Sequence, residues 1–136
     1  MVVSFDEIEL GDDLPVEQPD LSLEAVTRFT EGAEMRFPRF LDHDAARAEG
    51  LPGALVPGLM SQGLLLALLH RWAPGCVVRT IDTVFRGPLV VGTTADVGGA
   101  VTDIDDDEGT VEVDLTIVDE NGRTVVVGTA VVAPPV

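Results

Sequence analysis

The feature that most constrains the fold is a run over residues 56–72 (VPGLMSQGLLLALLHRW) that is apolar or small at almost every position. No polar stripe recurs in it at helical spacing, so a helix formed here has no side that favours water. Such a helix would be about 24 Å long. The run falls short of the roughly 18 uninterrupted apolar residues that a membrane span needs, and it ends in His70, Arg71 and Trp72. We therefore predict a helix buried on all sides in a protein core, with the rest of the chain wrapped around it.

Length and charge limit the domain organisation and the partners that are expected for this chain. The 136 residues predict one domain, residues 1–136. The net charge is −16 and all 8 basic residues are arginine, so the protein repels nucleic acid and anionic lipid, and neither is expected as a partner. The single cysteine, Cys76, can form no intramolecular disulfide and is predicted to be a small buried residue. The chain starts without a basic segment followed by an apolar run, which favours a cytoplasmic location.

Short helices are predicted before the apolar run. Ser22 is a good N-cap for a helix over residues 23–33, and Asp42 for a short helix over residues 43–49. Between them, residues 34–41 are predicted to be a loop, because Pro38 disfavours the helical conformation at the residue before it. The apolar side chains of this loop, which we expect to point inward, are Met35, Phe37, Phe40 and Leu41.

Everything after the apolar run is typical of β-structure. Strands are predicted over residues 77–86, 93–104, 111–118 and 123–133, with a bulge or bend at Gly98-Gly99 and a hairpin turn at Asn121-Gly122. Four strands in sequence predict an antiparallel meander. Strands of ten residues are about 33 Å long, which is enough to curl around the helix and bury both apolar surfaces. The expected fold is therefore α+β, a single hot-dog domain with an antiparallel sheet wrapped around a long central helix.

Three stretches together resemble the MaoC-like family of (R)-specific enoyl-thioester hydratases and dehydratases: FDEIELGDDLP (5–15), DHDAARAEGLPGALVPGLM (42–60) and VFRGPLVVG (84–92). The resemblance covers essentially the whole chain. It implies an acyl thioester of CoA or of an acyl-carrier protein as substrate or ligand, with no other cofactor and no metal. It also implies a homologous hot-dog partner, in a hetero- or homodimer or a pair of dimers.

The family's catalytic motif is changed in this sequence. The family pairs Asp and His in the form D-x-N-P-φ-H, and a backbone N–H at a helix-opening glycine polarises the thioester carbonyl. The proline and the helix glycine fall on Pro38 and Gly58, but the Asp falls on Met35 and the His on Phe40, which cannot transfer protons. Substrate contacts are implied at Met35, Phe37, Phe40, Pro57, Gly58, Leu59 and Ser61.

Other residues are candidates for the missing chemistry. Asp42 and His43 lie close by and are possible substitutes for the acid and base, although a cap and a surface residue are the alternative interpretation. Four arginines are candidate phosphate or partner contacts, with a solvated surface as the alternative: Arg36, Arg39, Arg79 and Arg86.

Three functions remain open at this stage. The first is a non-catalytic, tunnel-shaping subunit of a heteromeric hydratase or dehydratase. The second is a divergent acyl-thioester enzyme, such as a dehydratase, a polyketide-pathway cyclase or a thioesterase, that uses other residues. The third is a homodimer that binds an acyl ligand without catalysis.

Overall fold

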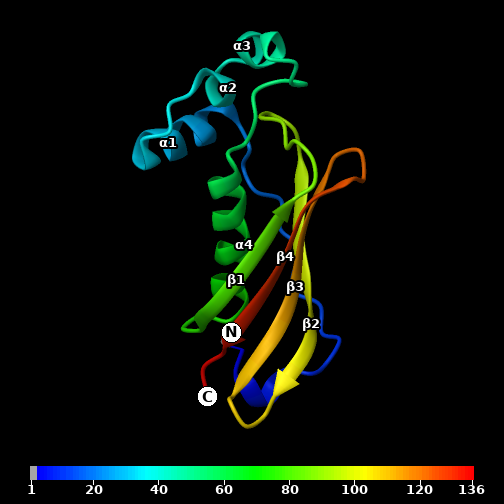
Figure 1. The fold of residues 1–136 in the computed structure, drawn as a ribbon. Coiled ribbons are helices and arrows are strands. Elements are labelled where there is room, and N and C mark those ends of the chain that lie inside the picture. The colour runs from blue at the N-terminus through cyan, green and yellow to red at the C-terminus, as the bar shows by residue number, and fades with distance from the viewer. Residues whose placement is uncertain (1–2) are drawn as a thin grey trace.

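A computed structural model describes residues 3–136 and shows one antiparallel sheet packed against one long helix (Figure 1). The helices are η1 (Phe5–Glu7), α1 (Leu23–Ala33), α2 (Pro38–Leu41), α3 (His43–Ala48) and α4 (Gly58–Trp72). The strands are β1 (Val77–Phe85), β2 (Ala95–Asp105), β3 (Thr110–Asp119) and β4 (Thr124–Ala133). The predicted α+β hot-dog fold is confirmed.

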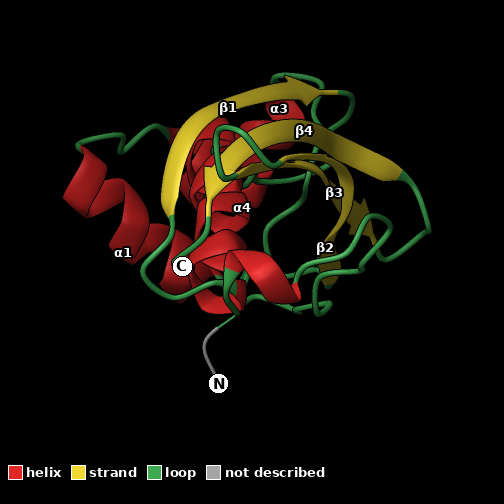
Figure 2. Cartoon of the chain, turned by 90° about the horizontal axis from the view of Figure 1, so that it is seen from below, coloured by secondary structure: helices red, strands yellow, loops and turns green. Residues whose placement is uncertain are grey.

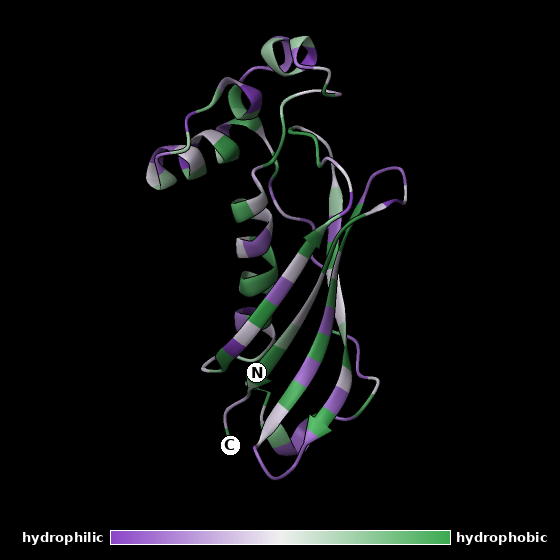
Figure 3. Ribbon diagram, viewed as in Figure 1, coloured by the Kyte–Doolittle hydropathy of each residue, from purple (hydrophilic) through white to green (hydrophobic). Residues whose placement is uncertain are grey.

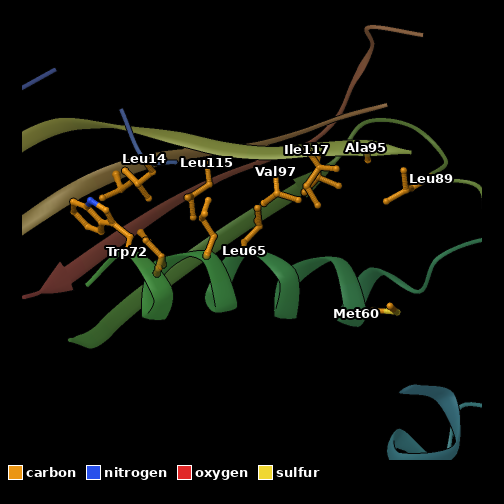
Figure 4. Close-up of a cluster of buried hydrophobic side chains, with 14 of the residues drawn as sticks. Leu14, Met60, Leu65, Trp72, Leu89, Ala95, Val97, Leu115 and Ile117 are labelled. Carbon is orange, nitrogen blue, oxygen red and sulfur yellow. The ribbon is translucent and has the colours of Figure 1, made fainter. Parts of the chain in front are cut away.

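Helix α4 supplies one half of the core. Leu65, Leu68 and Leu69 are fully buried against the inner face of the sheet, where they meet residues such as Leu115 and Ile117 (Figure 4). The strands curve over this side of the helix (Figure 2). Burying one leucine side chain contributes on the order of 1.5–3 kcal/mol, so this layer holds the sheet and the helix together.

The prediction that α4 is buried on all sides is wrong. Leu59 is 55% exposed and Gly63 is also exposed, so one side of the helix lies open. The physical reason is that a single sheet can cover only one side of a helix, while the remainder depends on neighbouring elements. In the structure of the single chain, α1 covers only part of the surface of α4 that the sheet leaves open.

The sheet is not a simple meander. Its order is β1-β4-β3-β2, so β1 pairs with β4 instead of β2. Strands β2, β3 and β4 do follow one another as antiparallel neighbours, and the predicted Asn121-Gly122 turn joins the last two. The β1–β2 connection, residues 86–94, is long enough to carry the chain to the opposite edge of the sheet, whereas the other two connections are tight turns.

The alternation along β3 is confirmed. Val111, Val113, Leu115 and Ile117 are buried, and hydrophobic and hydrophilic residues alternate along the strand in Figure 3. The predicted bulge at Gly98-Gly99 is wrong, because the register shift lies between Val101 and Asp103.

Gly99 instead allows a close approach of backbones. A Cβ atom added there would lie 2.6 Å from the backbone oxygen of Asp114.

Helices α1, α2 and α3 gather at one end of the molecule, beyond the N-terminal end of α4 (Figure 1). Ser22 caps α1 as predicted, since its hydroxyl accepts from the N–H of Ala25 at 3.1 Å. Residues 34–41 are not all loop: Pro38 occupies the first position of α2, where its missing N–H costs nothing. Phe37 is 55% exposed, which corrects the expectation that it points inward.

The two edges of the sheet differ. Residues of the N-terminal segment cover β2 through bridges that pair Asp13 with Ala100 and Glu17 with Val97. Glu17 also accepts two hydrogen bonds from Nε and Nη2 of Arg71 near the end of α4, at 2.8 and 2.6 Å. No strand of residues 3–136 covers the outer edge of β1.

Cys76 is buried as predicted, and burial raises the pKa of its thiol. Within residues 3–136, every helix is too short or too polar to cross a membrane.

Candidate functional site

The segment that leads into α4 is held in place by backbone hydrogen bonds to two other segments. The N–H of Leu55 donates to the oxygen of Arg39 at 2.8 Å, and the N–H of Val56 donates to the oxygen of Leu89 at 2.8 Å. Pro57 then ends this extended segment with φ −57° and ψ 142° and is buried. A proline side chain cannot cap a helix, so the first N–H groups of α4, from Gly58 onward, keep their partial positive charge without a partner inside the helix.

A small hollow of about 210 Å³ lies against this helix start. Its lining comes from the first turns of α4 (Gly58, Leu59 and Gln62) and from the end of β1 (Thr83 and Phe85). The ring of Phe85 covers Gly58 so closely that an added Cβ would lie 3.1 Å from its Cζ atom. Glycine is therefore the residue that lets the ring and the helix start approach each other.

One side-chain hydrogen bond crosses the hollow. Nε2 of Gln62 donates to Oγ1 of Thr83 at 3.2 Å, in a partly buried position. This bond leaves the amide oxygen of Gln62 and the hydroxyl hydrogen of Thr83 available to a ligand.

A larger groove of about 520 Å³ adjoins the hollow, because Leu59 and Gln62 line both. Its other walls are Phe29, Gly32 and Ala33 from α1, and Gly63 and Leu66 from α4, with Arg28 at its rim. A Cβ atom added at Gly32 or at Gly63 would meet no atom of residues 3–136 within 4 Å. The groove is thus wide and mainly apolar, as a pocket for an apolar chain or ring requires.

Neither lining offers a proton donor or acceptor suited to acid–base catalysis. Of residues 3–136, those that line the hollow and the groove include no Asp, Glu, His or Cys. Among residues 3–136, Arg28 is the one ionisable residue in these linings, and it pairs with Glu24 at 3.5 Å on the exposed face of α1. The site can therefore bind a carbonyl and an apolar group, but it does not by itself supply a base and an acid.

The two predicted substitutes have other contacts. Oδ1 of Asp42 accepts from the N–H groups of Asp44 and Ala45, at 2.9 and 3.1 Å, and so caps α3. Nδ1 of His43 accepts from the N–H of Ala54 at 3.0 Å. The neutral ring must then carry its proton on Nε2, and a Cβ added at Gly53 would lie 2.9 Å from Nδ1. Both residues shape the segment that leads into α4.

The structure of the single chain does not bring the remaining predicted substrate-contacting residues together. Met35 and Phe40 are half-buried, and the rings of Phe37 and Phe40 meet edge to face with centroids 6.0 Å apart. None of these three lines the hollow or the groove described above. Ser61 is 2% exposed and lies on the buried side of α4. Gly58 and Leu59 are the predicted residues that do line the hollow.

Sequence reasoning did not place several lining residues, among them Phe29, Thr83 and Phe85. One sequence signal was present. Gly63 lies inside the helix, where glycine costs about 1 kcal/mol of stability relative to alanine, so a packing or functional reason for this glycine was to be expected. No local sequence pattern indicated that β1 would pack against α4.

An antiparallel sheet curved around one helix defines the hot-dog class, and in this chain a mainly apolar groove opens beside the start of that helix. Solved structures of the same fold include MaoC-like dehydratases and (R)-hydratases. The (R)-hydratase from A. caviae involved in PHA biosynthesis has a TM-score of 0.89 and 23% sequence identity, with 94% of this chain and 98% of that chain covered.

Two further structures extend this group. The R-hydratase PhaJ1 from Pseudomonas aeruginosa has a TM-score of 0.91 and 20% identity, covering 98% of this chain and 86% of that chain. The ChsH1-ChsH2 complex from Mycobacterium tuberculosis has a TM-score of 0.85 and 20% identity, covering 93% and 98%. No protein-family model and no curated protein matches the sequence.

Proposed function

We propose that the chain is the non-catalytic, tunnel-shaping subunit of a heteromeric enoyl-thioester hydratase or dehydratase of the MaoC-like kind. One observation carries this proposal: an apolar groove of about 520 Å³ opens beside the N–H end of α4, and no carboxylate or imidazole of residues 3–136 lines it. Adding water across the C2–C3 bond of an enoyl thioester needs a base to activate the water and an acid to protonate C2. The partner subunit supplies that pair, while this chain holds the acyl group.

The free edge of the sheet supports a partner of the same fold. Val77, Val84 and Phe85 of β1 are each more than half exposed, as is Leu59 on the neighbouring start of α4. Unpaired strand edges with apolar side chains readily pair with another chain. A hot-dog subunit that adds its own β1 would continue the sheet and close the open side of the groove. The ChsH1-ChsH2 complex is a solved assembly whose fold this chain shares.

The test is to express the chain alone and together with a homologous hot-dog subunit that carries an intact D-x-N-P-φ-H motif. Hydration of a trans-2-enoyl-CoA is followed by the loss of absorbance of the conjugated thioester. We expect no turnover from this chain alone and turnover from the pair, with a preference for longer or bulkier acyl groups than the partner takes alone. Hydratase activity of the chain alone would refute the proposal.

The same experiment separates the alternatives. A divergent enzyme that uses Asp42 and His43 would lose its activity in the D42N and H43Q variants. Their capping and loop-holding contacts favour the non-catalytic interpretation. An acyl-binding homodimer would form no complex with the second subunit, and it would retain an acyl thioester detectable by mass spectrometry of the purified protein.

A further inference from the structure

A histidine holds the segment that leads into α4. Nδ1 of His43, the first residue of α3, accepts from the backbone N–H of Ala54 at 3.0 Å. Ala54 is fully buried, so its N–H group has no access to water. Loss of the acceptor would leave a buried donor without a partner, which costs more stability than the hydrogen bond itself contributes. The position of this segment therefore depends on an acceptor at Nδ1.

The ring of His43 is closely packed where it lies. A Cβ atom added at Gly53, the residue before Ala54, would lie 2.9 Å from Nδ1 and 3.0 Å from Cγ1 of Val90. The ring and Val90 thus occupy the space beside Gly53, which is itself buried. Among residues 3–136, the bond from Ala54 is the one hydrogen bond that the His43 side chain makes. The acceptor nitrogen therefore has a single partner in a confined space.

Ala54 connects this histidine to the start of α4. Its oxygen accepts from the N–H of Val91 at 2.8 Å, so Ala54 is bonded to α3 on one side and to the β1–β2 connection on the other. Gly58 opens the helix four residues further on, after Pro57, which has no N–H to donate. Residues 54–56 thus make the last N–H bonds before the helix, and one of these three bonds ends on a titratable group.

Charges of both signs lie on the elements around the ring, whereas residues 50–57 carry none. They belong to α3 and its end, to α2, which packs on α3, and to the β1–β2 connection, which contains Val90. The charged residues of these elements are Asp42, Asp44, Arg47, Glu49, Arg39 and Arg86. Arg47 and Arg39 pair with carboxylates, at 3.4 and 2.9 Å. The two carboxylates that flank His43 in the chain favour a charged ring, whereas the bond from Ala54 requires a neutral one.

We propose that His43 is a positioning residue: its neutral ring holds the N–H end of α4 in place, and protonation of the ring releases it. A protonated imidazole donates from both nitrogens, so its Nδ1–H would face the N–H of Ala54 and the bond would be lost. Histidine is the side chain that commonly changes its charge between about pH 5 and pH 8, so acidification in this range acts on the helix start. The effect on ligand affinity at Gly58 rests on the proposed function, whereas the effect on the segment does not.

The segment is tested first, without ligand, by heteronuclear NMR of the full chain between pH 8 and pH 5. At pH 8, a coupling across the hydrogen bond should join the amide nitrogen of Ala54 to Nδ1 of His43, and it should vanish as the ring takes up a proton. The amide signal of Gly58 should shift along the same titration curve. In H43N, the asparagine oxygen supplies an acceptor near the place of Nδ1 that does not titrate, so the Gly58 signal should stay in place. A Gly58 signal that behaves alike in wild type and H43N would overturn the proposal.

The site is tested second, by calorimetric titration with octanoyl-pantetheine at pH 8 and pH 5, in the assembly that the chain adopts in solution. Wild type should bind about tenfold more weakly at pH 5, the size of one lost hydrogen bond to a buried donor. H43N should keep the affinity at both pH values, and H43L, which has no acceptor, should bind weakly at both. H70N is the matched control, because His70 is the other of the 2 histidines and lies in the last turn of α4. Loss of the pH dependence in H70N, or its persistence in H43N, would overturn the proposal.

The two measurements distinguish this inference from the proposed function. If octanoyl-pantetheine binds to none of these proteins while the Gly58 signal follows the titration of His43, the proposed function fails and the positioning role stands. If the ligand binds equally tightly to wild type and H43L at both pH values, the positioning role fails and the proposed function stands. Should H43L not fold, the comparison of wild type with H43N decides the same question.

Discussion

Gly63 offers the sharpest test of the open side of α4, because two substitutions there should separate stability from binding. The position lies inside a helix, it is exposed, and an added Cβ meets no atom of residues 3–136 within 4 Å. Gly63→Ala and Gly63→Leu should therefore both fit without strain. Only the leucine side chain is long enough to fill the groove between α1 and α4.

The magnitudes follow from the helix and from the groove. Replacing an interior helix glycine by alanine or leucine raises the free energy of unfolding by about 0.5–1 kcal/mol. For a chain of this length that is a rise in Tm of about 2–4 °C. A side chain that competes for the ligand's place costs about 1–3 kcal/mol of binding, or roughly a 5- to 150-fold increase in Kd.

The assay pairs thermal unfolding with calorimetric titration of octanoyl-pantetheine. We expect both variants to gain stability, Gly63→Ala to bind nearly as the wild type, and Gly63→Leu to bind much more weakly. Unchanged binding by Gly63→Leu would refute the groove as the acyl site. A loss of stability in Gly63→Leu would mean that a neighbouring subunit packs tightly on this side of α4, and the assembly mass measured in parallel would show it.

The remaining predictions concern a surface ion pair and the sheet edge. The hydrogen bond from Arg71 lowers the pKa of Glu17 below its usual 4.5. Because this carboxyl pKa is lower in the folded than in the unfolded protein, the interaction stabilises the fold fully above pH 4.5, and this stabilisation is lost as the pH falls through the pKa of the folded state. E17Q should therefore cost about 0.5–1 kcal/mol at pH 7 by urea unfolding, and the same cost at pH 2 would contradict this account. V84E places a charge on the free edge of β1 and should reduce the assembly mass in light scattering, whereas L10E, at an exposed site away from that edge, should not. An unchanged mass for V84E would argue against pairing through β1.

Local patterns predicted the elements of this fold well. The caps at Ser22 and Asp42 satisfy helix N–H groups that only nearby side chains can reach, so sequence alone indicates them. The alternation along β3 and the turn at Asn121-Gly122 are local in the same way. The predicted strand order was wrong because the position of β1 beside β4 depends on a long connection, and no local pattern specifies the path of that connection.

The candidate site was predicted only in part. Gly58 and Leu59 were identified because a resemblance placed a functional glycine at the start of the helix, and both line the hollow. Phe85 and Thr83 come from a strand more than twenty residues away, and only the packing of β1 on α4 brings them to Gly58. Likewise, Arg86 was a candidate contact by its charge, but only the register of three strands places it in the same pocket lining as Arg123.

The sequence by itself determined that an apolar helix would be enclosed by strands, because an apolar run of this length in a chain that also forms strands is stable in water only when it is covered. Tertiary structure alone decided which side of that helix stays open. A single sheet covers one side, and the position of α1 then leaves a groove instead of a sealed core. The same long-range packing sets Phe85 over Gly58. Contacts between distant segments depend on how the chain is connected, which local patterns do not record.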